Sequence, residues 1–135
     1  MIKYANLMVI QSALRNLSNE VNLPANIKIQ VYKLSKEINL ENECLQKTNR
    51  ELIEKYVQKD NNGNKLTCIK FNNSVFNFGE NEQNYNIELD DLLNTEIFKL
   101  DDLAININAI DDMLPYINVY DLLTLEEFNL IKFKK

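Results

Sequence analysis

Residues 25–59 read ANIKIQVYKLSKEINLENECLQKTNRELIEKYVQK, and this stretch decides the fold class. Apolar residues recur along it at near-heptad steps and form a seam of Ile27, Val31, Leu34, Ile38, Leu45, Leu52 and Tyr56. Charged residues fill the positions between them, and neither Gly nor Pro interrupts the run. This period predicts one amphipathic helix, about 50 Å long at about 1.5 Å per residue.

The residues before this stretch predict a second helix. Its apolar stripe has steps of three and four residues and consists of Leu7, Ile10, Leu14, Leu17 and Val21. Pro24 suits the first turn of the following helix, because the N–H that proline lacks would be unpaired there. Two helices joined by so short a connection predict an antiparallel helical hairpin over residues 1–59.

A turn and a small sheet are expected next. The residues DNNG at 60–63 tolerate left-handed backbone geometry and predict a turn after the long helix. Short alternating runs then predict a small antiparallel sheet within residues 65–100. These runs are KLTCIKF (65–71), SVFNF (74–78) and NYNIEL (84–89).

The chain closes with the run NVYDLLTLEEFNLIKF at 118–133, which predicts a C-terminal helix. Asn118 is its expected cap, and one face is formed by Leu122, Leu125, Phe128 and Ile131. The fold class is therefore α+β. A length of 135 residues with 45% apolar side chains indicates a single domain, with a helical hairpin at 1–59 and a small acidic α+β part at 65–135.

Charge is distributed unevenly along the sequence. Residues 1–79 carry eleven Lys/Arg and seven Asp/Glu, whereas residues 80–127 carry thirteen Asp/Glu and only Lys99. Six of these acids are three Asp-Asp pairs at steps of 11 and 10 residues, each between apolar side chains: Asp90, Asp91, Asp101, Asp102, Asp111 and Asp112. Such a segment would attract a basic partner.

Three interpretations of the aspartate pairs stay open. In the first, each pair lies in an exposed turn or helix start, where carboxylates meet unpaired backbone N–H groups. In the second, carboxylates such as Asp90 and Glu96 hold Mg²⁺ or Mn²⁺ beside Lys99 for phosphodiester hydrolysis. In the third, all six act as anionic contacts that imitate a phosphate backbone and occupy a basic groove on another protein.

Several enzyme classes are excluded by what the sequence lacks. It has no His, which removes the usual general base and zinc ligand. Gly63 and Gly79 are its only glycines, too few for either common phosphate-binding loop. Cys44 and Cys68 stand far apart and are expected as reduced thiols, Cys44 as a small buried residue. We therefore expect no catalysis, no cofactor and no resident metal.

Two surfaces have alternative interpretations. Part of the helical seam is expected to stay open, which favours a homodimer or a larger protein partner. The aromatic residues Phe71, Phe76, Phe78 and Tyr85 could stack on nucleic-acid bases, but their strand spacing favours a small core. The acidic half argues against direct nucleic-acid binding. No membrane span or signal peptide is recognised, so the expected location is the cytoplasm.

The order of features resembles a family of short phage and prophage proteins from low-GC Gram-positive bacteria. The resemblance rests on LRNLSNEVNLP (14–24), RELIEKYVQKDNNGN (50–64), LLNTEI (92–97) and VYDLLTLEEF (119–128). The family has no assigned activity, so the resemblance implies a phage context alone. Together with the acidic half, it predicts an antagonist of a host defence system, anti-CRISPR-like, in the host cytoplasm. The alternative is a virion assembly or structural accessory protein that oligomerises through its helical hairpin.

Overall fold

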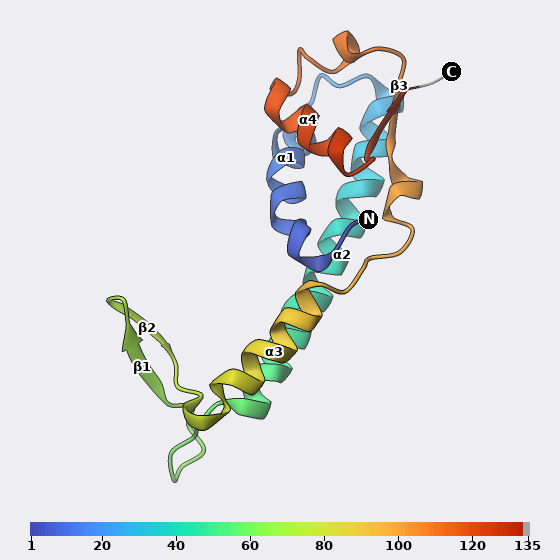
Figure 1. Ribbon diagram of the computed structural model, residues 1–135. Coiled ribbons are helices and arrows are strands. Elements are labelled where there is room, and N and C mark those ends of the chain that lie inside the picture. The colour runs from blue at the N-terminus through green and yellow to red at the C-terminus, as the bar shows by residue number, and fades with distance from the viewer. Residues whose placement is uncertain (134–135) are drawn as a thin grey trace. The chain divides into compact units, whose positions relative to one another are not determined.

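The computed structural model describes residues 1–133 and confirms the α+β class (Figure 1). Four α-helices, four short strands and four 3-10 turns occur in these residues. In chain order they are η1 (Tyr4–Asn6), α1 (Leu7–Asn19), α2 (Ala25–Tyr56), β1 (Thr67–Lys70), β2 (Asn73–Phe76), η2 (Gly79–Asn81), α3 (Glu82–Leu93), η3 (Leu100–Leu103), β3 (Ile105–Ile107), η4 (Ile110–Asp112), α4 (Val119–Glu127) and β4 (Ile131–Phe133).

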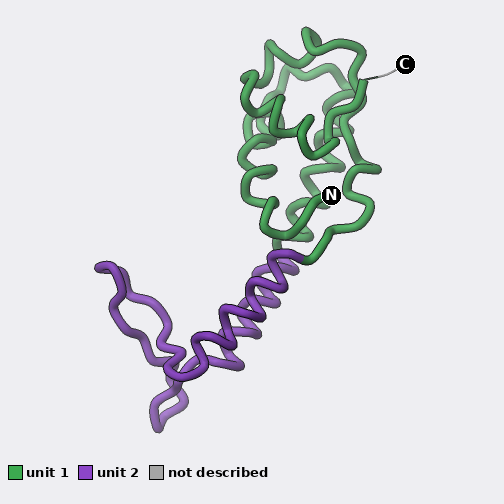
Figure 2. Tube along the Cα trace, in the orientation of Figure 1, with its two compact units in different colours: residues 1–42, 95–135 green, residues 43–94 purple. Residues whose placement is uncertain are grey.

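The chain forms two compact units, coloured separately in Figure 2. Residues 1–42 and 95–135 make the terminal unit, and residues 43–94 make the inserted unit. Helix α2 contributes its first part to the terminal unit and its last part to the inserted unit. The sequence pattern, which places the helical hairpin at 1–59, does not reveal this division of α2.

The predicted helical hairpin is confirmed by α1 and α2. Hydrogen bonds join Ser18 to Ser35 (2.9 Å) and Gln11 to Asn39 (3.2 Å), so the two helices run antiparallel. Their apolar stripes are buried together: Leu7, Ile10, Leu14, Leu17, Ile27, Val31, Leu34 and Ile38. Val21 is an exception, because α1 already ends at Asn19 and leaves this side chain 75% exposed.

Two strands and α4 complete the terminal unit. Strand β3 pairs in parallel with β4, and α4 lies in the connection between them. A parallel pair needs a crossover of this kind, and the sequence pattern does not predict it. Helix α4 also packs against α1. The core includes Ile105, Met113, Leu125 and Leu130, each with no exposed surface.

The predicted C-terminal helix is confirmed, but it is shorter than the sequence pattern implies. Asn118 caps it as expected, because its Oδ1 accepts the backbone N–H of Asp121 at 2.9 Å. The helix ends at Glu127, and Asn129 then adopts a φ of 59°, a left-handed geometry that asparagine tolerates. Ile131 therefore lies in β4 and not on the helix face.

The inserted unit consists of the end of α2, a β-hairpin and α3. Strands β1 and β2 are antiparallel, with Cys68 opposite Val75, so the first two predicted strands are confirmed. The third is wrong, because NYNIEL lies in α3. Its alternation includes Ile87, but this side chain is 53% exposed, whereas Tyr85 is buried and donates to Asn49 Oδ1 at 2.8 Å. The helical period prevailed because it places Tyr85 against α2.

No helix within residues 1–133 is long and apolar enough to cross a membrane.

Candidate functional site

All six candidate aspartates are exposed, and the structure distributes them over both units. Asp90 and Asp91 lie near the end of α3 in the inserted unit. The other four lie in the terminal unit, two in η3 and two in η4. These two turns precede and follow β3 along the chain. The terminal-unit set, Asp101, Asp102, Asp111 and Asp112, is called the aspartate turns below.

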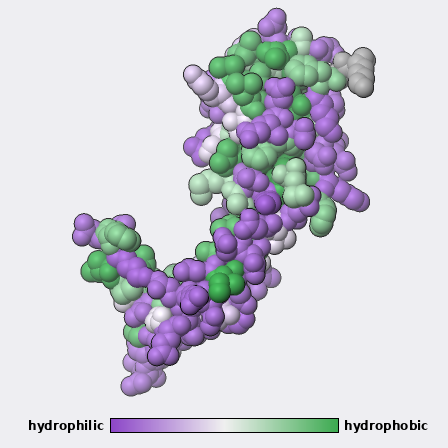
Figure 3. Space-filling model, viewed as in Figure 1, coloured by the Kyte–Doolittle hydropathy of each residue, from purple (hydrophilic) through white to green (hydrophobic). Residues whose placement is uncertain are grey.

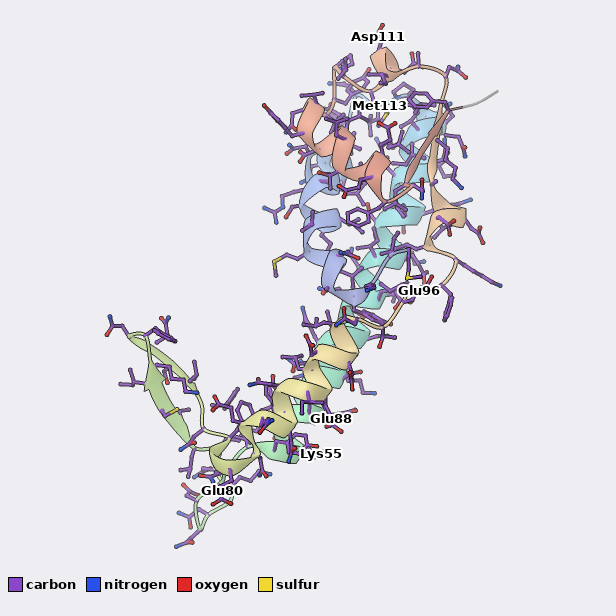
Figure 4. The ribbon with its side chains drawn as sticks, in the orientation of Figure 1. Lys55, Glu80, Glu88, Glu96, Asp111 and Met113 are labelled. Carbon is purple, nitrogen blue, oxygen red and sulfur yellow. The ribbon has the colours of Figure 1, made fainter. Side chains whose placement is uncertain are left out.

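The apolar neighbours explain why each pair in the aspartate turns is held outward. Leu100 begins η3 and is 2% exposed, so the Asp-Asp pair after it is anchored on a core residue. Met113 follows the η4 pair and has no exposed surface. Figure 4 shows Asp111 at the outer edge and Met113 directed into the unit. Anchoring of this kind reduces the entropy that the backbone must lose when the carboxylates bind a partner.

The capping interpretation accounts for some of these acids. Asp112 Oδ2 accepts the backbone N–H of Ala109 at 3.1 Å. Asp121 Oδ2, in the first turn of α4, accepts a hydrogen bond from the Asn118 side-chain amide at 2.9 Å. Asp90 lies near the C-terminal end of α3, where a helix start cannot explain it. Local hydrogen bonding is therefore a sufficient reason for Asp112, through a backbone N–H, and for Asp121, through a side-chain amide, and not for Asp90.

Folding mixes the charges that the sequence separates. The terminal unit carries nine Lys/Arg and eleven Asp/Glu, and the inserted unit carries six and nine. Their net charges are therefore −2 and −3, although residues 80–127 alone carry −12. Two acids of that segment are neutralised across elements, Glu88 by Lys55 (3.0 Å) and Glu82 by Lys70. An acidic contact surface must accordingly be smaller than the whole segment 80–127.

The structure supplies no metal centre among the residues it describes. Within residues 1–133, no three or more Cys, Asp or Glu side chains lie together in a way that would hold a metal ion. Of the metal-site candidates, Asp90 belongs to the inserted unit, and Glu96 and Lys99 belong to the terminal unit.

The β-hairpin exposes apolar side chains that the sequence pattern places in a core. Phe71 and Asn72 form its turn with φ values of 51° and 64°, and Phe71 is 96% exposed. Ile69 in β1 is 79% exposed, and hydrophobic surface is visible on the hairpin in Figure 3. The predicted aromatic core is therefore wrong for Phe71 and also for Phe76, which is 39% exposed. It holds for Phe78 and Tyr85, whose rings stack with centroids 4.1 Å apart.

Both cysteines are free, and the expected burial of Cys44 is wrong. Its side chain is exposed on α2, whereas Cys68 in β1 is half-buried. Cys44 falls in the part of α2 that belongs to the inserted unit, beyond the stretch of seam covered by α1. The sequence alone does not show where that cover ends.

A carboxylate clasp closes the base of the β-hairpin. Glu54 on α2 pairs with Lys59 (2.8 Å) and Lys65 (2.5 Å), which flank the predicted turn. Between them Asp60 Oδ1 accepts the backbone N–H groups of Asn62 and Asn64, both at 2.9 Å, which confirms that turn. These backbone hydrogen bonds lower the pKa of Asp60. The hydrogen bonds from Lys59 and Lys65 lower the pKa of Glu54 from 4.5 to about 2.

The clasp predicts how the stability of the protein changes at acid pH. Because the clasp lowers the Glu54 pKa, the stability that ionised Glu54 contributes is complete above about pH 4.5. This stability is lost as the pH falls towards 2. Replacing Lys59 and Lys65 together by Ala should raise the Glu54 pKa towards 4.5, measured by NMR titration of the side-chain carboxyl. Lys47→Ala on the same helix is the control and should leave it unchanged. An unchanged pKa in the double variant would show that the clasp does not form in solution.

An apolar groove of about 380 Å³ lies between the end of α1 and the start of α2 in the terminal unit. Its walls include Leu17, Ile29 and Tyr32, with Glu20 and Lys28 as charged members. Opposite charges at one groove give it no net preference for an anion or a cation. We assign it no ligand.

Comparison of the chain with protein-family models, with curated proteins and with solved structures found no match.

Proposed function

We propose that the protein acts by binding another protein and carries out no chemistry of its own. The observation that supports this most strongly is the pair of aspartate turns, in which exposed carboxylates project from turns anchored by the buried Leu100 and Met113. Fixed anionic groups of this kind complement a basic surface. In the phage context suggested by the resemblance, that surface is the basic nucleic-acid-binding site of a host defence protein in the cytoplasm.

Charge reversal in the aspartate turns is the first test of this proposal. Asp102→Lys with Asp111→Lys reverses one charge in each turn and spares Asp112, which holds the N–H of Ala109. We expect recovery of a basic host protein from lysate to fall more than about tenfold, because charges that complement a partner become repulsive. The free energy of unfolding should change by less than about 0.5 kcal/mol per exposed substitution.

The control variant makes the same change in net charge away from the aspartate turns. Glu43→Lys with Glu51→Lys adds the same charge at two exposed positions of α2 in the inserted unit. If the control loses the partner as completely as the aspartate variant, attraction by net charge and not the turns would explain binding. If the aspartate variant unfolds, the carboxylates have a structural role. Washing at high salt should release the partner from the wild-type protein.

A second function is virion assembly through self-association, and the surface that supports it is the exposed β-hairpin of β1 and β2, not the helical hairpin expected from the sequence. Ile69 and Phe71 present large apolar side chains on a two-stranded sheet, and sheets of this size are marginally stable without further cover. Ile69→Thr with Phe71→Asn removes this apolar surface and keeps residues suited to a strand and a left-handed turn. If assembly is the function, the wild-type protein is an oligomer by light scattering and the variant is a monomer.

The two functions are separated by using both variants in both measurements. Electrostatic binding predicts that only Asp102→Lys with Asp111→Lys loses the host partner. Assembly predicts that only the hairpin variant changes mass, and that the proteins recovered from infected lysate are phage structural proteins. Val21→Ser, at a 75% exposed apolar position outside the hairpin, is the control for a general loss of apolar surface.

A further inference from the structure

The turn at the base of the hairpin carries the one Asn-Gly step in the sequence, Asn62–Gly63. Both residues are exposed. Gly63 has a φ of 82°, and apart from Gly63 and its two neighbours in the chain no residue has a heavy atom within 4 Å of the place where a Cβ would be. Within residues 1–133, no hydrogen bond holds the side-chain amide of Asn62, whose only bond is from its backbone N–H to Asp60. The amide carbon of Asn62 is thus open to attack by the next backbone nitrogen.

We infer that Asn62 is a site of spontaneous deamidation. The backbone nitrogen of Gly63, deprotonated by hydroxide, forms a bond to Cγ of Asn62, and the bond from Cγ to the side-chain nitrogen breaks. Ammonia leaves with the proton, and a five-membered succinimide remains. Water then opens this ring at either carbonyl and gives aspartate or isoaspartate at position 62. The balance is one water consumed and one ammonia released, with no change in oxidation state.

Glycine is what makes this step feasible in a folded chain. A side chain on the attacking residue would crowd the ring, and glycine has none. The competing interaction is the hydrogen bond from Gly63 N–H to the Asp60 carbonyl at 3.1 Å. This bond belongs to an exposed turn with no core contact, so local opening releases it at little cost. Asn61 and Asn64 lie in the same turn but precede Asn62 and Lys65, whose side chains hinder the same reaction.

Deamidation changes the turn as well as the charge. The chain gains one negative charge, and the new carboxylate lies two residues from Asp60. Isoaspartate also adds a methylene to the backbone, which displaces the bond from Asp60 N–H to the Asn64 carbonyl (2.9 Å). The clasp residues Lys59 and Lys65 lie at either end of this turn, so the base of the hairpin loosens with age.

The test is incubation of the full-length protein at neutral and alkaline pH, followed by tryptic digestion. Cleavage after Lys59 and Lys65 releases one peptide, residues 60–65, that contains Asn61, Asn62 and Asn64. We expect this peptide to gain the mass of an amide-to-acid change, located at Asn62 by fragmentation, at a rate first order in hydroxide. The intact protein should gain a negative charge in ion exchange, and Asn62→Ala should abolish both changes.

Two results would overturn the inference. In the first, Asn62 stays intact in the folded protein while the same residue is converted in urea, which would mean that the turn protects it. In the second, Asn61 or Asn64 is converted before Asn62. Asn62→Ala is expected to fold normally, because the side chain of Asn62 makes no hydrogen bond within the described residues.

Discussion

Leu34→Ala is expected to lower the free energy of unfolding by about 2–5 kcal/mol. Leu34 lies on α2 with no exposed surface, among the residues that pack between α2 and the rest of the terminal unit. Truncation removes the transfer free energy of the missing carbons and leaves a cavity that a close-packed core fills only in part. The measurement is urea denaturation followed by circular dichroism.

Leu40→Ala is the matched control for this substitution. It changes the same residue type in the same helix, but Leu40 is 46% exposed. Its expected cost is below about 1 kcal/mol, because less apolar surface returns to water and no closed cavity forms. Equal losses at the two positions would mean that Leu34 is not in a core, and that the hairpin packs differently in solution.

Glu43→Pro is expected to destabilise the protein by about 3 kcal/mol or more. Glu43 is an exposed residue in the interior of α2, at the first position of the inserted unit. Proline removes the helical hydrogen bond from the residue 43 N–H, and its ring collides with the carbonyl of Asn39 one turn earlier. The loss should appear in helical circular dichroism and in urea denaturation.

Glu43→Ala isolates the backbone effect of this change. It removes the same side chain and keeps the N–H, and alanine has the highest helix propensity, so stability should stay the same or rise slightly. If the proline and alanine variants are equally stable, α2 is interrupted near Glu43 and does not run unbroken through both units.

The helical hairpin was predictable because its signal is repeated. The stripe on α1 and the first half of the seam on α2 each give several turns of consistent period, and the buried residues are those that the period selects. The same holds for the cap at Asn118, which needs only local chemistry. Features that depend on residues close together in the sequence can therefore be predicted from it.

Other features depend on partners distant in sequence. The run NYNIEL alternates like a strand, yet it is helical, because the helix lets Tyr85 donate a hydrogen bond to Asn49 on α2. The pairing of β3 with β4 joins segments that are only three residues each, too short to show a period. The exposure of Cys44 and Phe71 depends on which element covers them, and no local pattern reports that.

The candidate site was predictable in composition and not in arrangement. The aspartates are exposed as the sequence suggests, but their division between α3 and the aspartate turns follows from the boundary at residue 94. The net acidity of residues 80–127 also overstates the local charge, because basic residues from the first half of the chain share both units. Proximity in sequence is a poor guide to electrostatic surfaces when two segments fold together.

The insertion of one unit within the other has a consequence for synthesis on the ribosome. Chains emerge from the N-terminus at about 5–20 residues per second, and contiguous segments can fold as they appear. Residues 43–94 form a contiguous unit, whereas the terminal unit cannot pair β3 with β4 until residue 133 has left the exit tunnel. Helix α1 and the first part of α2 can pair with each other early, but the face of α1 that packs against α4 stays uncovered until Val119–Glu127 has emerged. The terminal unit therefore completes its core later in synthesis than the inserted unit does.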